Sequence, residues 1–318
     1  MKNLNFFEGE KGAKRIRYVI SSLIISAMVC FASILDNKEA IFPEVAALTI
    51  GWLVMDKKVW NVSTFEFIIM MTIGAFAGLF ISRYSPFHIY FSLLLAFGFV
   101  GVVLMTFRIS LLPMISACML PVLLHCRSWA YPLSVFAMSA IIGATRFLLV
   151  KKGLHMNIAY KAQQMDIYRG LFYWGLLSFV LAILMVIPVF GEYRYCILPP
   201  LVVTYVEFAN TKSGFRDRPI QVFFSIVAAS VIGATLHFAG LQIGIPAAIT
   251  ALFISTCIFF LFERFTSPFA PAAAIGFIPL IVPQEDLLIL PLQVTIGAAI
   301  LITVALLLYV IYPSRLTA

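Results

Sequence analysis

The sequence predicts an all-α polytopic membrane protein with about twelve transmembrane helices, arranged as two parallel six-helix repeats. Three observations support this prediction: an apolar composition, apolar stretches of membrane-spanning length, and similarities that recur about 155 residues apart. Of the 318 residues, 62% are hydrophobic and only 11% are charged, whereas a soluble domain has roughly 45–50% apolar and about 25% charged residues. The composition therefore excludes a water-soluble fold.

A helix that crosses a bilayer needs about 20 apolar residues, with a working range of roughly 17–25. Cutting the chain at its charged residues leaves twelve candidate segments. In order they cover approximately residues 18–35, 41–55, 64–82, 87–107, 109–126, 131–150, 170–190, 195–210, 219–239, 241–262, 267–283 and 286–312. The first segment is long and lacks the small-residue cleavage site of a signal peptide, so we expect it to be a retained anchor.

The basic residues predict an orientation. If the N-terminus is cytoplasmic and all twelve segments cross, 18 of the 22 Lys and Arg residues fall on the cytoplasmic side. This bias follows the positive-inside rule. It predicts a protein of the plasma (inner) membrane with both termini in the cytoplasm. Because topology accounts for the net charge of +8, nucleic acid is not an expected partner.

Similar positions recur along the chain. The segment Ile41-Phe-Pro-Glu-Val-Ala-Ala-Leu-Thr49 resembles Ile197-Leu-Pro-Pro-Leu-Val-Val-Thr204, and Gly78 matches Gly233 in the same register. We therefore expect a first repeat over residues 1–153, a cytoplasmic linker over 154–169 and a second repeat over 170–318. Six helices are an even number, so both repeats enter from the cytoplasm and are parallel.

Segments 2, 5, 8 and 11 are short or contain proline, and they hold corresponding positions in the two halves. Pro113 and Pro121 are eight residues apart in segment 5, as Pro271 and Pro279 are in segment 11. Proline removes a backbone donor, and irregular backbone is tolerated in a membrane only when it is buried in protein or lines a cavity. Paired broken helices are typical of transporter substrate sites. The alternative is that these prolines only kink helices for packing.

The candidate substrate-binding residues of these segments are the four prolines together with the matched hydroxyls Thr49 and Thr204. Glu207 is the strongest single candidate for a functional residue. It lies eleven residues beyond Cys196, which places it about 16 Å into a hydrocarbon core roughly 30 Å thick. A carboxylate at that depth usually pairs, faces water or carries a proton. Glu207 is therefore predicted to take part in proton coupling or substrate binding, the alternative being a structural partner for Tyr205, Arg216 or a helix of the other half.

Glu44 follows Pro43 near the outer end of segment 2. It has two interpretations, a guard of an entrance or an ordinary first-turn carboxylate facing the positive end of a helix dipole. The second is the more common situation.

The loop between segments 8 and 9 contains Lys212, Arg216 and Arg218. These cations are predicted to attract an anionic solute. The alternative is a positive-inside anchor that contacts lipid headgroups.

Chemistry other than transport finds little support in the sequence. The four His residues lack metal-ligand spacing, and no nucleotide-binding loop, nucleophile elbow or HExxH motif is present. We therefore expect no catalytic residue, no cofactor and no metal site, and the protein is predicted not to be an enzyme. The expected partners are the lipid bilayer and a small solute. A homodimer is also compatible with the sequence, because lipid-facing and helix-facing apolar surfaces look alike.

Two families share local features with the chain. Phe42-Pro-Glu-Val-Ala-Ala-Leu-Thr-Ile-Gly51 with Met71-Thr-Ile-Gly-Ala-Phe-Ala-Gly78 resembles the membrane core of FUSC proteins (fusaric acid resistance and aromatic acid exporters). The second half resembles the HPP family, with Pro199-Pro200, a polar loop ending at Arg218-Pro219, and Ser267-Pro-Phe-Ala-Pro271 in place of the His-Pro-Pro motif. Phe269 and Ala270 replace the His and first Pro of that motif, so no role that rests on the His is implied. The resemblance implies transport of a small inorganic anion, nitrite-like, or export of an organic acid.

The predicted function is a membrane transporter, secondary and proton-coupled, for a small organic or inorganic anion. Its solute site is expected near the membrane midplane, between segments 2, 5, 8 and 11. The alternatives are an anion channel and a non-transporting membrane component, such as a lipid-modifying enzyme or a subunit of a complex.

Overall fold

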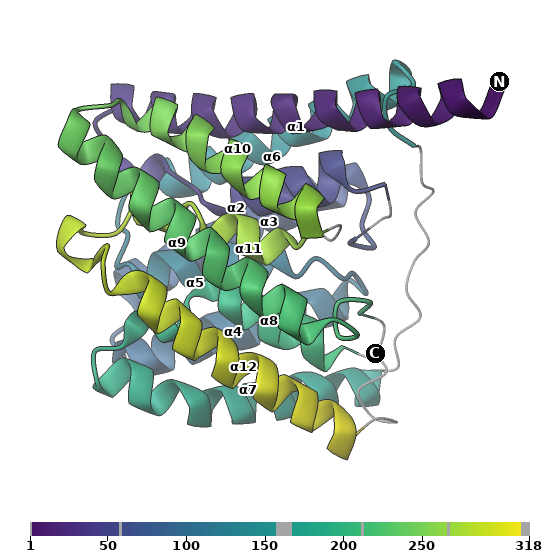
Figure 1. Ribbon diagram of the computed structural model, residues 1–318. Coiled ribbons are helices and arrows are strands. Elements are labelled where there is room, and N and C mark those ends of the chain that lie inside the picture. The colour runs from purple at the N-terminus through teal and green to yellow at the C-terminus, as the bar shows by residue number, and fades with distance from the viewer. Residues whose placement is uncertain (1, 57–58, 157–166, 211–212, 266–267, 313–318) are drawn as a thin grey trace.

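The computed structural model describes residues 2–56, 59–156, 167–210, 213–265 and 268–312, and 79% of the chain is helical with no strand in the described part. Within these described ranges, eight helices are long and apolar enough to cross a membrane. They are α1 (Lys2–Ile34), α3 (Thr64–Tyr84), α4 (Ile89–Thr106), α6 (Ala130–Lys151), α7 (Ile167–Phe190), α9 (Pro219–Ile243), α10 (Ala247–Phe265) and α12 (Leu290–Ile311). The eight helices make this a helical, membrane-embedded protein (Figure 1).

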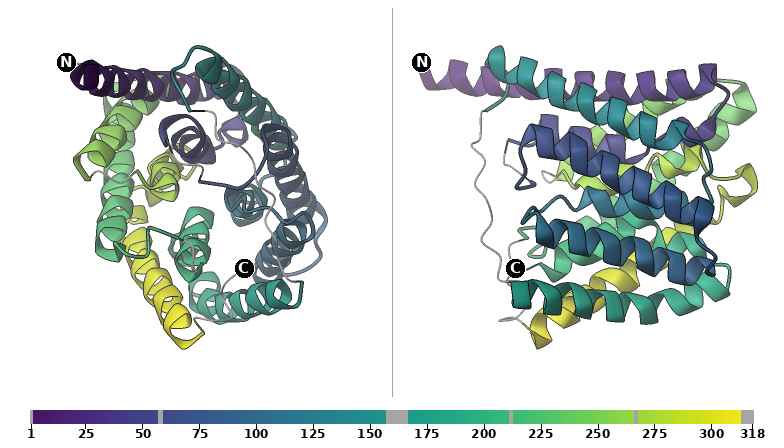
Figure 2. Two further views of the ribbon diagram at one scale, coloured as in Figure 1. Left: turned by 90° about the vertical axis from the view of Figure 1, so that its right-hand side faces the viewer. Right: turned by 180° about the vertical axis from the view of Figure 1, so that it is seen from behind.

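Four short helices lie inside the ring that the long helices form (Figure 2, left). They are α2 (Glu44–Thr49), α5 (Pro113–Leu123), α8 (Pro199–Ala209) and α11 (Ala270–Ile275). They correspond to the predicted segments 2, 5, 8 and 11. Their helical parts are too short to cross a hydrocarbon core of about 30 Å unaided, because an α-helix rises only about 1.5 Å per residue.

The ring follows an order that the sequence does not suggest. On one side α1 packs on α10, α10 on α9 and α9 on α12, and on the other side α7 packs on α4, α4 on α3 and α3 on α6. The first helix of each half therefore packs against the fourth helix of the other half. The N-terminal end of α1 and the C-terminal end of α12 lie at the same end of the bundle (Figure 1).

The prolines of the short helices have a different role from the one predicted. Pro113 and Pro271 lie in the first turns of α5 and α11, and Pro199 begins α8. Proline suits this position because the first-turn N–H has no helical acceptor and the ring fixes φ near the helical value. Of the predicted pairs, only Pro121 lies inside an α-helix, which ends two residues later at Leu123. Most of these prolines start helices where we expected them to break helices.

The C-terminal end of α2 continues as a π-helical turn, Ile50–Val54. Arg17 of α1 donates to Asp56 Oδ1 at 2.6 Å and to the carbonyl of Leu53 at 3.5 Å. The guanidinium of Arg146 lies 4.6 Å from the ring centroid of Trp52 in this turn. Cations near the C-terminal carbonyls of a helix are favourable, so these arginines hold the irregular end of α2 in place.

Substitution of Arg17 by alanine is expected to destabilise the protein by about 1–3 kcal/mol, because it leaves Asp56 and the Leu53 carbonyl without their partner. Arg17 is only 2% exposed, whereas Arg15 on the same helix is exposed. Arg15→Ala is therefore the matched control, with an expected change below about 0.5 kcal/mol. Thermal unfolding of the purified protein in detergent compares the two. Equal unfolding temperatures in both variants would show that the Arg17 contacts do not contribute to stability.

Two close approaches join long and short helices in corresponding places. Gly78 of α3 faces the backbone of Cys118 in α5, and Gly233 of α9 faces the backbone of Gly276, directly after α11. A Cβ at position 233 would lie 2.8 Å from the carbonyl carbon of Gly276, and a Cβ at position 78 would lie 2.7 Å from Cγ of Pro121. Only glycine permits α3 and α9 of the ring to approach the central helices this closely.

Two apolar grooves open on the surface of the ring. The first has a volume of about 790 Å³ and lies between α1 and α6, with Phe31 and Leu133 among its exposed lining residues. The second has a volume of about 470 Å³ and lies between α7 and α12, with Ile187 and Leu292 among its exposed lining residues. In each case the groove separates the first and last helices of one half of the sequence.

Candidate functional site

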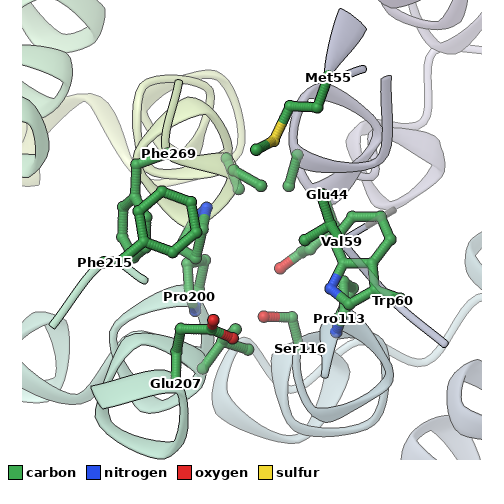
Figure 3. A pocket seen from close by; sticks show the side chains of 15 residues that line it. Glu44, Met55, Val59, Trp60, Pro113, Ser116, Pro200, Glu207, Phe215 and Phe269 are labelled. Atoms are coloured by element: carbon green, nitrogen blue, oxygen red, sulfur yellow. The ribbon is translucent and has the colours of Figure 1, made fainter. Parts of the chain in front are cut away.

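The four short helices converge on one central pocket, and each presents residues three, four or seven positions apart to it. The lining side chains from these helices are Glu44 and Ala47 of α2, Pro113 and Ser116 of α5, Pro200, Val203 and Glu207 of α8, and Ala270, Pro271 and Ala274 of α11. Such spacing places side chains on one face of a helix. The structure thus brings together the segments from which the sequence predicted a site (Figure 3).

Glu44 is the most unusual side chain of the pocket. It is the first residue of α2 and only 1% exposed, and neither carboxylate oxygen has a partner within hydrogen-bond geometry among the described residues, although the Ser116 hydroxyl lies nearby. Its oxygens point into the pocket, towards the space that the Ser116 hydroxyl also faces (Figure 3). Buried polar groups in proteins nearly always have a partner. An unpartnered buried carboxyl in a pocket is therefore a candidate functional group.

Glu207 reaches the same pocket from α8, and its side chain extends from the lower edge of the view in Figure 3. It is partly exposed, and the Ser213 side chain hydrogen-bonds to its carboxyl group. The structure thus places Glu207 beside a cavity, whereas its depth in the membrane stays a prediction. The structural partners considered for it, Tyr205 and Arg216, bond elsewhere: Tyr205 donates to the Leu177 carbonyl and Arg216 to the Asn210 carbonyl.

Aromatic side chains cover the end of the pocket at which α2 and α8 finish. Trp60 and Phe215 lie in the loops after these helices, and Phe269 lies just before α11. The rings of Phe215 and Phe269 meet edge to face at 4.9 Å between centroids, and Trp60 lies against Gly51. Met55, Val59 and Phe215 at this end are partly exposed, Trp60 and Phe269 are buried there, and Ser116 and Glu44 at the other end are also buried. The pocket therefore has an aromatic mouth and a sealed floor.

The pocket is small. Its volume is about 20 Å³, and a cavity needs roughly 10–15 Å³ to hold one water molecule. In this conformation it accommodates a group of the size of water or an ammonium. Anything larger requires movement of the mouth residues.

The predicted hydroxyls Thr49 and Thr204 do not line this pocket. Both are buried and donate to carbonyls of their own helices, to Ala46 at 3.0 Å and to Pro200 at 2.9 Å. Among the predicted prolines, Pro113 and Pro271 line the pocket. Pro121 instead packs near Gly78, and Pro279 lies in the 3-10 turn Ile278–Leu280 beyond α11.

Two of the three predicted anion-attracting cations, Arg216 and Arg218, do not line the pocket. The Arg216 guanidinium lies 3.6 Å from the ring centroid of Tyr309 in α12, and Arg218 is exposed at the start of α9. Lys212 lies outside the described residues. Among the described residues that line the pocket, none is basic.

Three side chains that sequence reasoning missed are Ser116, Trp60 and Phe215. Ser116 lies three residues after Pro113, so it shares the pocket-facing side of α5. Trp60 and Phe215 are 155 positions apart, within the spacing of the other matched positions. That spacing was the available signal for both aromatic residues.

The described residues contain no group of three or more His, Cys, Asp or Glu side chains that could hold a metal ion. What the pocket offers chemically is two carboxyl groups and a hydroxyl in largely apolar surroundings. Such groups bind protons or cations reversibly, and their affinity for either depends on access to water.

A scan against protein-family models, a search of curated proteins and a search of solved structures each found no match to this chain. The resemblance to the HPP and FUSC families therefore stays a prediction. The conclusion from sequence and structure together is a helical membrane-embedded protein with a carboxyl-bearing pocket at its centre.

Proposed function

We propose that this protein is a secondary transporter that couples the movement of a small solute to protons through the central pocket. The observation that carries the proposal is Glu44, a fully buried carboxyl without a hydrogen-bond partner, in one pocket with Glu207. Ionisable groups inside a membrane protein are costly, and they mark ion pathways and proton relays. Four short helices around a central site fit the pattern of transporters in which discontinuous helices form the binding site.

The proposed architecture has twelve crossing segments in two parallel six-helix repeats. The order long, short, long, long, short, long occurs twice among the described helices. The glycine contacts at Gly78 and Gly233, and the paired grooves of the ring, agree with this arrangement. The contact of α2 with α11 is likewise matched by that of α8 with α5. The bounds 1–153, 154–169 and 170–318 remain our proposal for the two repeats and the linker.

The proposed orientation has both termini in the cytoplasm of a cell with the protein in its plasma (inner) membrane. It is supported by the excess of basic residues at that end. The aromatic mouth of the pocket then faces the cytoplasm. A second pocket of about 80 Å³, lined by Lys38, Glu39 and Tyr131 among others, lies towards the opposite end. Alternating access would connect the central site to each end in turn.

Protonation of Glu44 and Glu207 is the proposed coupling step. The titratable side chains that face them from packed helices are Tyr131 of α6, near Glu44, and Tyr173 of α7, near Glu207. Both phenols donate to backbone carbonyls, Tyr131 to Ala117 and Tyr173 to Val206. Outside the membrane segments, burial lowers the pKa of His155, and the charges of Arg146 and Arg17 lower it further. His155 is thus mainly neutral at pH 7.

Glu207→Gln is expected to remove the pH dependence of solute flux, because the amide cannot exchange a proton. The measurement uses proteoliposomes that contain a pH-sensitive dye, with solute added under imposed pH gradients. Glu285→Gln is the matched control, since Glu285 is exposed in the turn Gln284–Asp286. Unchanged pH-dependent flux in Glu207→Gln would contradict the coupling role of this residue.

The same assay separates the alternatives. Flux that does not saturate with solute concentration favours a channel over a transporter. No flux of any solute, under conditions in which the protein is folded, favours a non-transporting membrane component.

A further inference from the structure

We infer that the solute of the central pocket is an organic cation whose ammonium group binds between Glu44 and Glu207. This inference rests on the proposed transport function for its physiological meaning, but the binding site itself is argued from the pocket. It differs from the anion that the sequence predicted, and the experiment below decides between the two.

The first argument is charge. The oxygen-bearing side chains of the pocket are Glu44, Ser116 and Glu207, and no described lining residue is basic. An anion would therefore meet two carboxyl groups and no cation among these residues. A cation would supply the partner that both oxygens of Glu44 lack.

The second argument is that the nearby described cations have other partners. Arg17 pairs with Asp56 at 2.6 Å, and Arg146 stacks on Trp52. Arg216 stacks on Tyr309 and bonds to the Asn210 carbonyl. Neutralising Glu44 with one of these side chains would require breaking existing contacts. A ligand that brings its own positive charge does not.

The third argument concerns the body of the ligand. Trp60, Phe215 and Phe269 cover the mouth, together with Met55 and Val59. Aromatic faces attract cations and also pack well against apolar groups. A hard metal ion prefers six or more oxygen ligands, which this largely apolar lining does not favour. The combination of buried carboxyls and aromatic rings is suited to an amine with an apolar substituent.

The size of the pocket fixes how such a ligand would sit. A volume of about 20 Å³ has room for the ammonium group but not for a substituent of several carbon atoms, because it equals little more than one water molecule. The ammonium would therefore occupy this space, between Glu44 and Glu207. The apolar body would lie between the aromatic rings, once Trp60 and Phe215 have moved apart.

The test compares three probes of the same shape: benzylammonium, benzoate and benzyl alcohol. Equilibrium binding to the detergent-purified protein is measured by isothermal titration at pH 8, at which carboxyl groups have less competition from protons. We expect benzylammonium to bind, and Glu44→Gln to weaken that binding at least tenfold. Glu207→Gln is the second variant, in case the first does not fold. Glu66→Gln is the matched control, because Glu66 lies in the capping box of α3 outside the pocket, and we expect it to bind like the unmodified protein.

Several outcomes overturn the inference. They are the absence of benzylammonium binding, binding that neither glutamate variant changes, and equal or stronger binding of benzoate or benzyl alcohol. Flux of the same probes into proteoliposomes tests the transport function separately. Benzoate that moves with protons leaves the transporter standing and ends the cation inference. Glutamate-dependent benzylammonium binding without flux of any probe confirms the cation site and contradicts transport.

Discussion

Gly233→Ala is expected to lower the stability of the protein by about 1–3 kcal/mol, the usual cost of overpacking a well-packed site. The new methyl carbon would lie 2.8 Å from the carbonyl carbon and 3.1 Å from the Cα of Gly276. Both neighbours are backbone atoms, which cannot turn aside as a side chain can. α9 and α11 would have to move apart. Because α11 forms one wall of the central pocket, the pocket would change shape. We therefore also expect solute flux to fall more than the loss of folded protein explains.

Gly98→Ala is the matched control for this prediction. Gly98 lies in the middle of α4, and a Cβ there would meet no atom within 4 Å. Alanine in a helix is favoured over glycine by about 0.5–1 kcal/mol, so this variant should be neutral or slightly more stable. Thermal unfolding in detergent compares the variants. Equal unfolding temperatures for Gly233→Ala and Gly98→Ala would mean that α9 and α11 do not approach as closely as described. Gly78→Ala should resemble Gly233→Ala, because its Cβ would lie 2.9 Å from the carbonyl carbon of Cys118.

Glu44→Gln is expected to have the largest effect on transport, a loss of proton-coupled flux of about 100-fold or more. Removal of one essential proton-transfer group typically costs 10²–10⁴-fold in related proton-transfer chemistry. Glutamine keeps the size of the side chain but can neither bind a proton reversibly nor carry a charge. Because Glu44 is fully buried and Glu207 is partly exposed, the Glu44 variant should be affected more strongly than Glu207→Gln.

The stability of Glu44→Gln separates a functional role from a structural one. Since neither oxygen of Glu44 bonds to the protein, the variant should unfold at the same temperature as the unmodified protein, or at a higher one. A functional carboxyl held in place for its chemistry commonly reduces stability. Glu66→Gln controls for the substitution itself, because glutamine also completes a capping box. Full proton-coupled flux in Glu44→Gln would remove the main support for the proposed function.

Most of the helices could be predicted from the sequence, because the length of each apolar stretch and the charged residues at its ends are visible along the chain. The predicted segments 64–82 and 131–150 agree closely with α3 (Thr64–Tyr84) and α6 (Ala130–Lys151). The exception is α1, which begins at Lys2, well before residue 18. The apolar criterion detects where a helix enters the lipid, but a helix can extend into water beyond that point.

The lateral position of each side chain could not be predicted. In a soluble helix the polar side marks the surface, but here lipid-facing and protein-facing sides are both apolar. That Glu207 lies in a short helix could therefore be predicted from the sequence, whereas the direction of Glu44 into the pocket could not. The same reason explains Arg216: its stacking on Tyr309 joins positions almost a hundred residues apart, and no local pattern contains it.

The packing of α1 on α10 and of α7 on α4 resembles the exchange of an identical element between the protomers of a swapped dimer, here within one chain. Each proposed repeat gives its first helix to the other repeat, so neither would have a complete wall by itself. Two copies of a single six-helix ancestor could have formed the same ring as a homodimer. The exchange also means that the sequence halves are unsuitable as rigid moving bodies, because their separation would break both contacts. These contacts divide the eight long helices into two four-helix walls, α1–α10–α9–α12 and α7–α4–α3–α6, with the two apolar grooves as the seams between them.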